Sequence, residues 1–261
     1  MKIHSFNINK IKKVKPGHLR VTAIDNRFYN DAPFVNSKKN LPQWFRSIHK
    51  GDFSVRSCSG ISDFLEFGFT IPAWTSFKFT PNINTKAWEC TAGALNPNNQ
   101  PFQMADGFPF HQTGQCPMTG VRKLETMSYP KLITPWRMQT APGWSCLILP
   151  ILYEENPNYS VLPAIVNTDY YQIMNIVLNV KTDSEFSIKQ GTPLAHVIPI
   201  QRKTNVRELE FIDETFFKYA SSGMYLTGGI SPSEGTGIAY RKAARVVDAA
   251  LEEEKKKWFR K

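Results

Sequence analysis

Apolar and polar residues alternate through the middle of the chain, between about residues 131 and 200. Successive side chains of a strand point to opposite faces of a sheet, so this alternation predicts strands with one buried face. The predicted strands are Leu132–Met138, Trp144–Ile151, Val161–Val166, Ile173–Val180, Phe186–Ile188 and Leu194–Ile200. The sequence Thr140-Ala141-Pro142-Gly143 and the glycine at 191 mark tight turns between them.

The segments before this block carry further strand patterns. Residues 53–92 place aromatic side chains on both sides of a turn at Pro72-Ala73, and we interpret them as strands. Residues 1–50 form an N-terminal arm and adapter in our interpretation. We expect a strand at Leu19–Ile24 and a short helix within Lys38–Lys50, where a proline follows the first residues.

The last part of the chain changes character. Apolar residues at helical spacing predict helices at Val206–Tyr219 and Ile238–Arg260, and the segment between them is rich in Gly and Ser. We therefore expect three parts: the arm and adapter at 1–50, a β core at 51–205 and a C-terminal helical segment at 206–261. The polar stretch Asn96–Gly120 predicts a long loop within the β core.

The composition supports a folded, mainly β protein. Hydrophobic residues make up 41% of the 261 residues, and 18 prolines and 15 glycines punctuate the chain as they do where many short elements alternate with turns. No stretch reaches the roughly 18 apolar residues of a membrane helix. The first 20 residues lack the apolar region of a secretory signal. We expect no membrane contact and a location in the cytoplasm of the cell that makes the protein.

The net charge of +10 is concentrated near the two ends, at Lys10–Lys15 and Lys255–Lys261. Basic runs of this kind act as solvated tails or as docking arms, and they predict at most non-specific contact with nucleic acid. The sequence contains no zinc-finger, helix-turn-helix or RNA-recognition motif, so specific base recognition is not expected.

Four cysteines lie at wide and uneven spacings, which is typical of reduced thiols: Cys58, Cys90, Cys116 and Cys146. A metal site built from Cys90, His111 and Cys116 is conceivable. Structural zinc sites normally carry more closely paired ligands, so we expect no metal there.

Residues 140–200 carry a recognisable order of motifs. The segment 164–170 has the sequence Ala-Ile-Val-Asn-Thr-Asp-Tyr, and the segment 191–199 has the sequence Gly-Thr-Pro-Leu-Ala-His-Val-Ile-Pro. Together with the Pro142-Gly143-Trp144 turn, this order resembles the dUTPase and dCTP-deaminase family. The resemblance implies a β-clip, dUTPase-like barrel, here with an N-terminal β extension and C-terminal helices. It also implies a homo-oligomer, with a trimer as the usual state.

The segment 191–199 is also similar to the corresponding motif of an uncharacterised family of tailed phages and bacteria, and the similarity suggests a cyanophage-like origin. That resemblance implies a viral protein, located in the host cytoplasm or in the virion.

The resemblance also indicates candidate site residues. In the family the first Asp of the motif is the base that activates water, and this chain has Asn167 there, whose amide cannot accept a proton at neutral pH. Asp169 matches the family's second acidic position, and Tyr170 matches the residue beneath the sugar. The segment Ile148–Tyr153 lacks the family's phosphate-binding hydroxyl pair. Asn167, Asp169 and Tyr170 are thus candidates for ligand binding, although Tyr170 and its neighbour Tyr171 are expected to serve mainly in packing.

Three functions stay open at this point. The preferred one is a non-enzymatic phage structural or assembly protein, associated with the virion or not, without catalytic residue, metal or cofactor. The second is a nucleotide-metabolism enzyme, a dNTP pyrophosphatase or a deaminase-like protein, in which Mg²⁺ assists and Asp169, or else Asp63 or Glu66, acts as the base. The third is a regulator that binds a nucleotide without turning it over.

Overall fold

The computed structural model describes residues 14–24, 26–31, 33–49, 54–85, 87–93, 110–111 and 129–202. The contacts within the chain divide these residues into two compact units. The first unit contains the described residues up to Ser37 and from Gly68 to Arg202, and the second contains those between Lys38 and Phe67.

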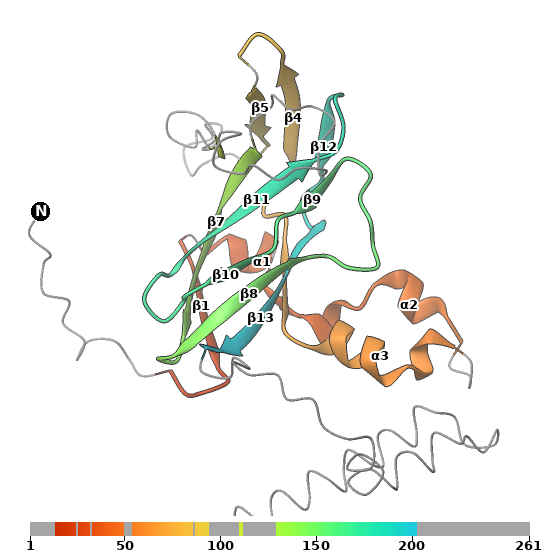
Figure 1. The fold of residues 1–261 in the computed structure, drawn as a ribbon, viewed down its shortest axis with the longest axis vertical. Coiled ribbons are helices and arrows are strands. Elements are labelled where there is room, and N and C mark those ends of the chain that lie inside the picture. Colours follow the sequence, from red (N-terminus) through yellow and green to blue (C-terminus); the bar gives the residue numbers. More distant parts are fainter. Residues whose placement is uncertain are drawn as a thin grey trace, which may run out of the picture. The chain divides into compact units, whose positions relative to one another are not determined.

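The first unit consists of antiparallel β-sheets (Figure 1). One sheet has the order β1 (Leu19–Ala23), β7 (Tyr129–Thr140), β11 (Ile173–Val180) and β9 (Tyr159–Val161), and β6 (Phe110–His111) also pairs with β7. A second sheet has the order β10 (Ala164–Val166), β8 (Trp144–Pro150), β13 (Pro193–Gln201), β3 (Phe69–Pro72) and β2 (Val35–Asn36). A third sheet contains β12 (Phe186–Ile188), β4 (Phe77–Asn82) and β5 (Ala87–Ala92). A short helix, α1 (Phe28–Asp31), follows β1.

A single hydrophobic core joins the three sheets. Strand β7 buries every second residue from Leu132 to Thr140, and β11 does the same from Met174 to Val180. Because side chains alternate across a strand, these positions point inward together. The largest of the fully buried side chains is that of Trp136, with 0% exposure. The core therefore follows directly from the period of two in the sequence.

Two glycines form the turns that the sequence predicts. Gly143 has φ +80° and ends the β7–β8 turn, in which the Trp144 amide donates to the Ala141 carbonyl at 3.0 Å. Gly191 has φ +82° between β12 and β13. Residues with a Cβ atom rarely adopt this left-handed region, so glycine is favoured at both places.

The prediction of a mainly β fold is confirmed, and most of the predicted strands agree with the structure within two residues. The prediction of one strand at Val161–Val166 is wrong, because Pro163 lies between two strands that belong to different sheets. Proline has no amide hydrogen to donate to a sheet. The β9 end of the segment pairs with β11, and the β10 end pairs with β8.

The strand prediction is also wrong for the first part of residues 53–92. This segment belongs to the second unit and begins with a 3₁₀ turn, η3 (Val55–Ser57), and the helix α3 (Ser59–Glu66). Ile61, Phe64 and Leu65 recur at helical spacing, and that period outweighs the β preference of the aromatic residues. The short helix predicted within Lys38–Lys50 is confirmed. It consists of η2 (Ser37–Asn40) and α2 (Gln43–Ser47), with Pro42 at the N-cap.

The predicted loop at Asn96–Gly120 lies almost entirely outside the described residues, as do the two C-terminal helices and the basic segments 10–13 and 255–261. The proposed boundaries at residues 50 and 205 stay predictions. Among the described elements, no helix combines the length and the apolarity needed to span a bilayer.

Candidate functional site

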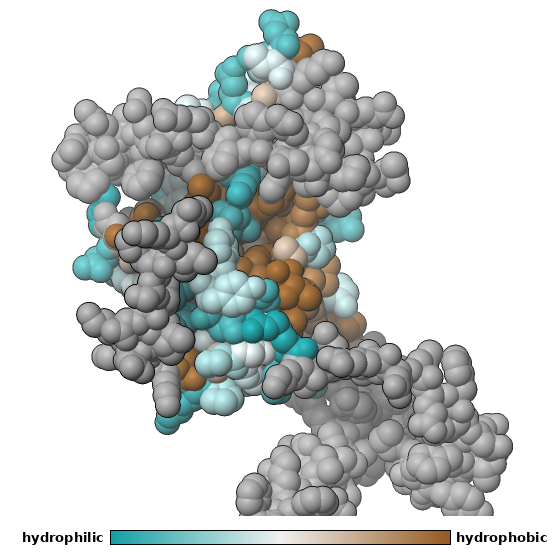
Figure 2. Space-filling view, turned by 60° about the vertical axis from the view of Figure 1, so that its left-hand side comes forward, coloured by the Kyte–Doolittle hydropathy of each residue, from teal (hydrophilic) through white to brown (hydrophobic). Residues whose placement is uncertain are grey.

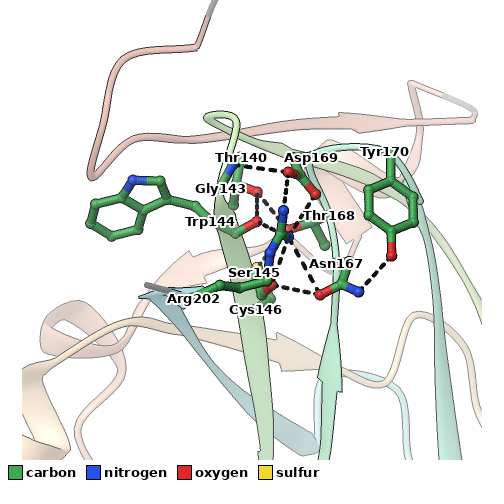
Figure 3. Close-up of polar contacts among 10 residues, drawn as sticks. All are labelled: Thr140, Gly143, Trp144, Ser145, Cys146, Asn167, Thr168, Asp169, Tyr170 and Arg202. Atoms are coloured by element: carbon green, nitrogen blue, oxygen red, sulfur yellow. Dashed lines mark hydrogen bonds and ion pairs between the residues drawn. The ribbon is translucent and has the colours of Figure 1, made fainter. Parts of the chain in front are cut away.

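Five polar residues from three separate segments converge at the end of the second sheet where β8 begins (Figure 3). We call them the Asp169–Arg202 cluster: Ser145 on β8, Asn167, Asp169 and Tyr170 in the turn after β10, and Arg202 after β13.

The register of the sheet explains why these residues meet. Strand β8 pairs with β10 on one side, where Val166 lies opposite Cys146. It pairs with β13 on the other side, where Gln201 lies opposite Trp144. The residues that follow Val166 and Gln201 therefore arrive at the same end of the sheet, and the start of β8 lies between them.

The turn after β10 brings Asp169 back towards β8. The carbonyl of Asn167 accepts hydrogen bonds from the amides of Tyr170 at 3.2 Å and Tyr171 at 2.9 Å. Below the turn, the Thr140 and Thr168 hydroxyls are 2.8 Å apart, and both residues are buried. The Thr168 hydroxyl also donates to the Cys146 Sγ at 3.4 Å. These contacts fix the turn from beneath, so the positions of the exposed residues are set by buried ones.

Asp169 and Arg202 form a two-pronged ion pair. The Arg202 Nη1 donates to one carboxylate oxygen at 2.8 Å, and Nη2 donates to the other at 2.5 Å. The Gly143 amide donates to the second oxygen at 3.0 Å. Both oxygens of the carboxylate thus already accept charge-assisted or backbone hydrogen bonds, the strongest kinds available to them.

Asn167 uses its amide as acceptor and donor at once. Its Oδ1 accepts from the Ser145 hydroxyl at 2.8 Å and from the Arg202 Nη1 at 3.4 Å. Its Nδ2 donates to the Tyr170 hydroxyl oxygen at 2.6 Å. A carboxylate at this position has no hydrogen to donate, so the observed pattern suits an amide.

The electrostatic setting keeps Asp169 ionised. The hydrogen bond from Arg202 is the largest cause, and it lowers the pKa of the Asp169 carboxyl, helped by the Gly143 amide, although burial opposes the shift. The Asp169 side chain is only 11% exposed. A general base works best with a pKa near the operating pH and with free access to a proton. Asp169 has a lowered pKa, and its oxygens are already engaged.

The cluster is also a poor match for a divalent cation. Mg²⁺ binds through carboxylates and keeps several waters. Of the cluster residues only Asp169 carries a carboxylate, and the positive guanidinium of Arg202 already occupies both of its oxygens. In the part of the chain that the structure describes, no group of three or more His, Cys, Asp or Glu residues is arranged to hold a metal ion.

The structure brings the three predicted site residues together, and ligand binding by them stays a prediction. Tyr170 and Tyr171 are 69% and 45% exposed, so neither is buried among the described residues, and a role of these tyrosines in packing stays a prediction. The Arg202 guanidinium lies over the Tyr170 ring, with its Cζ atom 5.9 Å from the ring centroid.

Sequence reasoning missed Arg202 and Ser145. Arg202 is 33 residues from Asp169 along the chain, and only the pairing of β13 with β8 connects them. The one signal for Arg202 in the sequence is its place directly after a predicted strand, and the sequence does not show which strand lies beside it.

The other candidate residues are only partly described. Cys90 lies half-buried on β5, where burial raises the pKa of its thiol, and Cys116 lies outside the described residues. The metal question for Cys90, His111 and Cys116 is therefore untested. Asp63 and Glu66 belong to α3 in the second unit, where Glu66 forms an ion pair with Lys38 at 3.3 Å.

Comparison with known proteins gives structural neighbours alone. No protein-family model matches the sequence, and neither does any curated protein. Among solved structures, a native dUTPase from EIAV covers 76% of this chain and 99% of its own, with 9% identity and a TM-score of 0.33. A mutant dUTPase from phage phi11 of S. aureus, described with a structural Mg(II) ion, covers 76% and 97%, with 9% identity and a TM-score of 0.30. Similarity at this level does not specify an activity.

Proposed function

We propose that this chain is a non-enzymatic structural or assembly protein, in which the Asp169–Arg202 cluster stabilises the fold. One observation carries the proposal. The Asp169 carboxylate, two residues from Asn167 in the chain, is held by both terminal nitrogens of the Arg202 guanidinium and by a backbone amide. A catalytic carboxylate must be free to orient and deprotonate water, whereas Asp169 is arranged as one half of a structural ion pair.

Three segments distant in sequence depend on this ion pair. Arg202 contacts the β7–β8 turn, since its amide donates to the Gly143 carbonyl at 2.9 Å and its Nη1 donates to the Trp144 carbonyl at 3.0 Å. The same guanidinium binds the turn after β10 through Asp169. The cluster thus fastens the ends of β8, β10 and β13 to one another, which supports a role in stability.

The enzymatic alternative has a direct test. We expect no pyrophosphate release and no deamination when the full chain is incubated with dUTP, dCTP or other deoxynucleoside triphosphates and magnesium. Turnover at an enzyme-like rate by the wild-type protein, lost in Asp169→Asn and kept in Glu89→Gln, would establish the alternative and end the proposal.

The phage origin and a place in the virion are the finer part of the proposal, supported by the sequence resemblance of residues 191–199. We expect the protein to be present in purified phage particles in a fixed ratio to the major head protein, as quantitative mass spectrometry would measure. Presence in infected cells but absence from particles and from assembly intermediates would exclude both a virion role and an assembly role.

Self-association is part of the same proposal. The strand β10 lies at the edge of its sheet, and its Ile165 side chain is 61% exposed. On the face drawn in Figure 2, hydrophobic residues gather in patches between hydrophilic ones. Edge strands with exposed apolar side chains are common pairing sites. We expect a homo-oligomer, with a trimer as the first candidate, and light scattering coupled to size exclusion measures the mass directly.

The nucleotide-binding regulator is kept as a second candidate because the exposed Tyr170 ring lies beside Arg202. An exposed aromatic ring next to a guanidinium can stack with a base. Titration calorimetry with dUTP and dCTP tests it. Binding that weakens in Tyr170→Ala would favour the regulator, and absence of heat at millimolar nucleotide would remove it.

A further inference from the structure

Figure 1 shows the chain leaving the far end of β8 and running to β9. Residues of this connection line a small pocket. Its cavity volume is about 150 Å³. The floor is apolar. Tyr159 and Val161 come from β9 of the first sheet, and Pro150 and Leu194 come from β8 and β13 of the second. Tyr159, Val161 and Leu194 are 5%, 3% and 1% exposed, so the floor is part of the packed core. A volume of about 150 Å³ is enough for one benzene-sized ring.

The rim of the pocket is charged. Glu154, Glu155 and Lys181 line it, giving two negative charges and one positive charge, against a net charge of +10 for the whole chain. Within the described residues, neither glutamate forms an ion pair. The two carboxylates therefore stay available, and the local sign of charge is opposite to that of the molecule as a whole. Such a rim repels phosphates and attracts cations.

The backbone of the rim is held in an unusual conformation. Tyr153, which also lines the pocket, has φ +64°, the one positive φ among the described residues other than glycine. For a bulky residue the left-handed region is unfavourable, and such a conformation persists only where the surroundings enforce it. The surroundings of Tyr153 thus hold this residue in place, which favours a preformed pocket over one that a ligand must create.

We propose that this pocket docks a segment of a partner protein that inserts one aromatic side chain flanked by lysine or arginine residues. The ring enters the apolar floor, and the flanking cations approach Glu154 and Glu155. Charge complementarity identifies the partner chemistry, because an apolar cavity alone accepts any hydrophobic group, and only the acidic rim selects a basic segment. The pocket is separate from the Asp169–Arg202 cluster, so the inference holds whether or not that cluster has an activity.

The test uses the full chain and the fluorescein-labelled peptide acetyl-Lys-Lys-Trp-Lys-Lys-amide, with fluorescence anisotropy at low ionic strength. We expect saturable binding. The double variant Glu154→Gln/Glu155→Gln is expected to weaken it about five-fold, from two exposed charge contacts of ordinary strength. Lys181→Glu is expected to tighten binding by about three-fold, because it makes the rim more negative. The matched control is Glu89→Gln, which removes an exposed carboxylate of β5 that is not among the pocket-lining residues.

Peptide variants separate the ring from the charge. Replacement of the peptide's tryptophan by alanine, or of its lysines by glutamates, is expected to abolish saturable binding. Equal binding of uncharged N-acetyltryptophanamide, or equal binding by the Glu154→Gln/Glu155→Gln and wild-type proteins, would overturn the inference. If light scattering showed an oligomer that Glu154→Lys/Glu155→Lys converts to monomers, and the peptide did not compete, the occupant would be a second copy of the chain and the partner assignment would be wrong.

Discussion

The charged groups near the two ends of strand β8 differ in whether they have ion-pair partners. At its start, Ser145 lies in the Asp169–Arg202 cluster, where every charge has a partner within hydrogen-bonding distance. Past its end, Glu154 and Glu155 stand at the rim of a cavity with no ion pair in the described part of the chain. Paired groups at one end hold the protein together, and unpaired groups at the other end are left for a second molecule.

The difference follows from the neighbours of β8. At its start the strand has β10 on one side and β13 on the other, and residues that continue both strands are forced together. Polar groups brought together in a half-buried position must pair, since an unpaired one costs about 1–3 kcal/mol. Beyond Pro150 the chain leaves the sheet and joins β9, which pairs with β11 in another sheet. The space between the sheets at that point stays open.

Among the substitutions at the two ends of β8, the largest effect is expected at Arg202. Arg202→Leu leaves the Asp169 carboxylate, 11% exposed, without its partner. We expect a loss of about 2–3 kcal/mol in the free energy of unfolding, because a mostly buried charge then lacks compensation. Urea unfolding measures it as a lower midpoint with an unchanged slope. Arg20→Leu, on the exposed side of β1, is the control and should cost less than about 1 kcal/mol. Equal losses in the two variants would mean that the ion pair does not stabilise the fold.

The strands and three of the five cluster residues could be predicted from the sequence, but Arg202 could not. The alternation at residues 173–180 and 186–188 gave strands with the same bounds as β11 and β12, because a period of two is a local property. The motif order around residue 170 pointed to Asn167, Asp169 and Tyr170. Arg202 could not be found in this way, because its role depends on the register of β13 against β8, and register is a property of the whole sheet.

The helix α3 and the pocket were missed for related reasons. Aromatic residues at 64 and 67 suggested a strand, although the apolar positions 61, 64 and 65 follow a helical period. The pocket requires Leu194, Val161 and Glu154 to meet, and these belong to two different sheets and a loop. No local pattern encodes a space between two sheets.

A second, smaller effect concerns acid. The pKa of Asp169 is lowered in the folded protein, so its contribution to stability is complete above the unfolded pKa of about 3.9 and is lost as the pH falls through the folded pKa. We expect the urea midpoint of the wild-type protein to fall more steeply below pH 4 than that of Asp169→Asn. The comparison variant is Glu185→Gln, since the pKa of Glu185 is also lowered, mainly by a hydrogen bond from Lys78, but the group is exposed and its effect should vanish in salt. Identical acid profiles for wild type and Asp169→Asn would contradict this role for the ion pair.

The smallest effect is expected at the pocket end, from the backbone of Tyr153. Tyr153→Gly and Tyr153→Ala both remove the aromatic side chain, and they differ only in the Cβ atom that makes φ +64° unfavourable. We expect the glycine variant to be more stable than the alanine variant by about 0.5–1 kcal/mol in urea unfolding, because relief of the left-handed strain exceeds the entropy that glycine gains in the unfolded chain.

Equal stability would show that the loop relaxes once the ring is gone. In that case the pocket shape depends on the tyrosine side chain, and both variants should then bind the basic peptide equally weakly. If instead the backbone conformation is imposed by the loop, the glycine variant keeps the pocket and with it most of the peptide affinity.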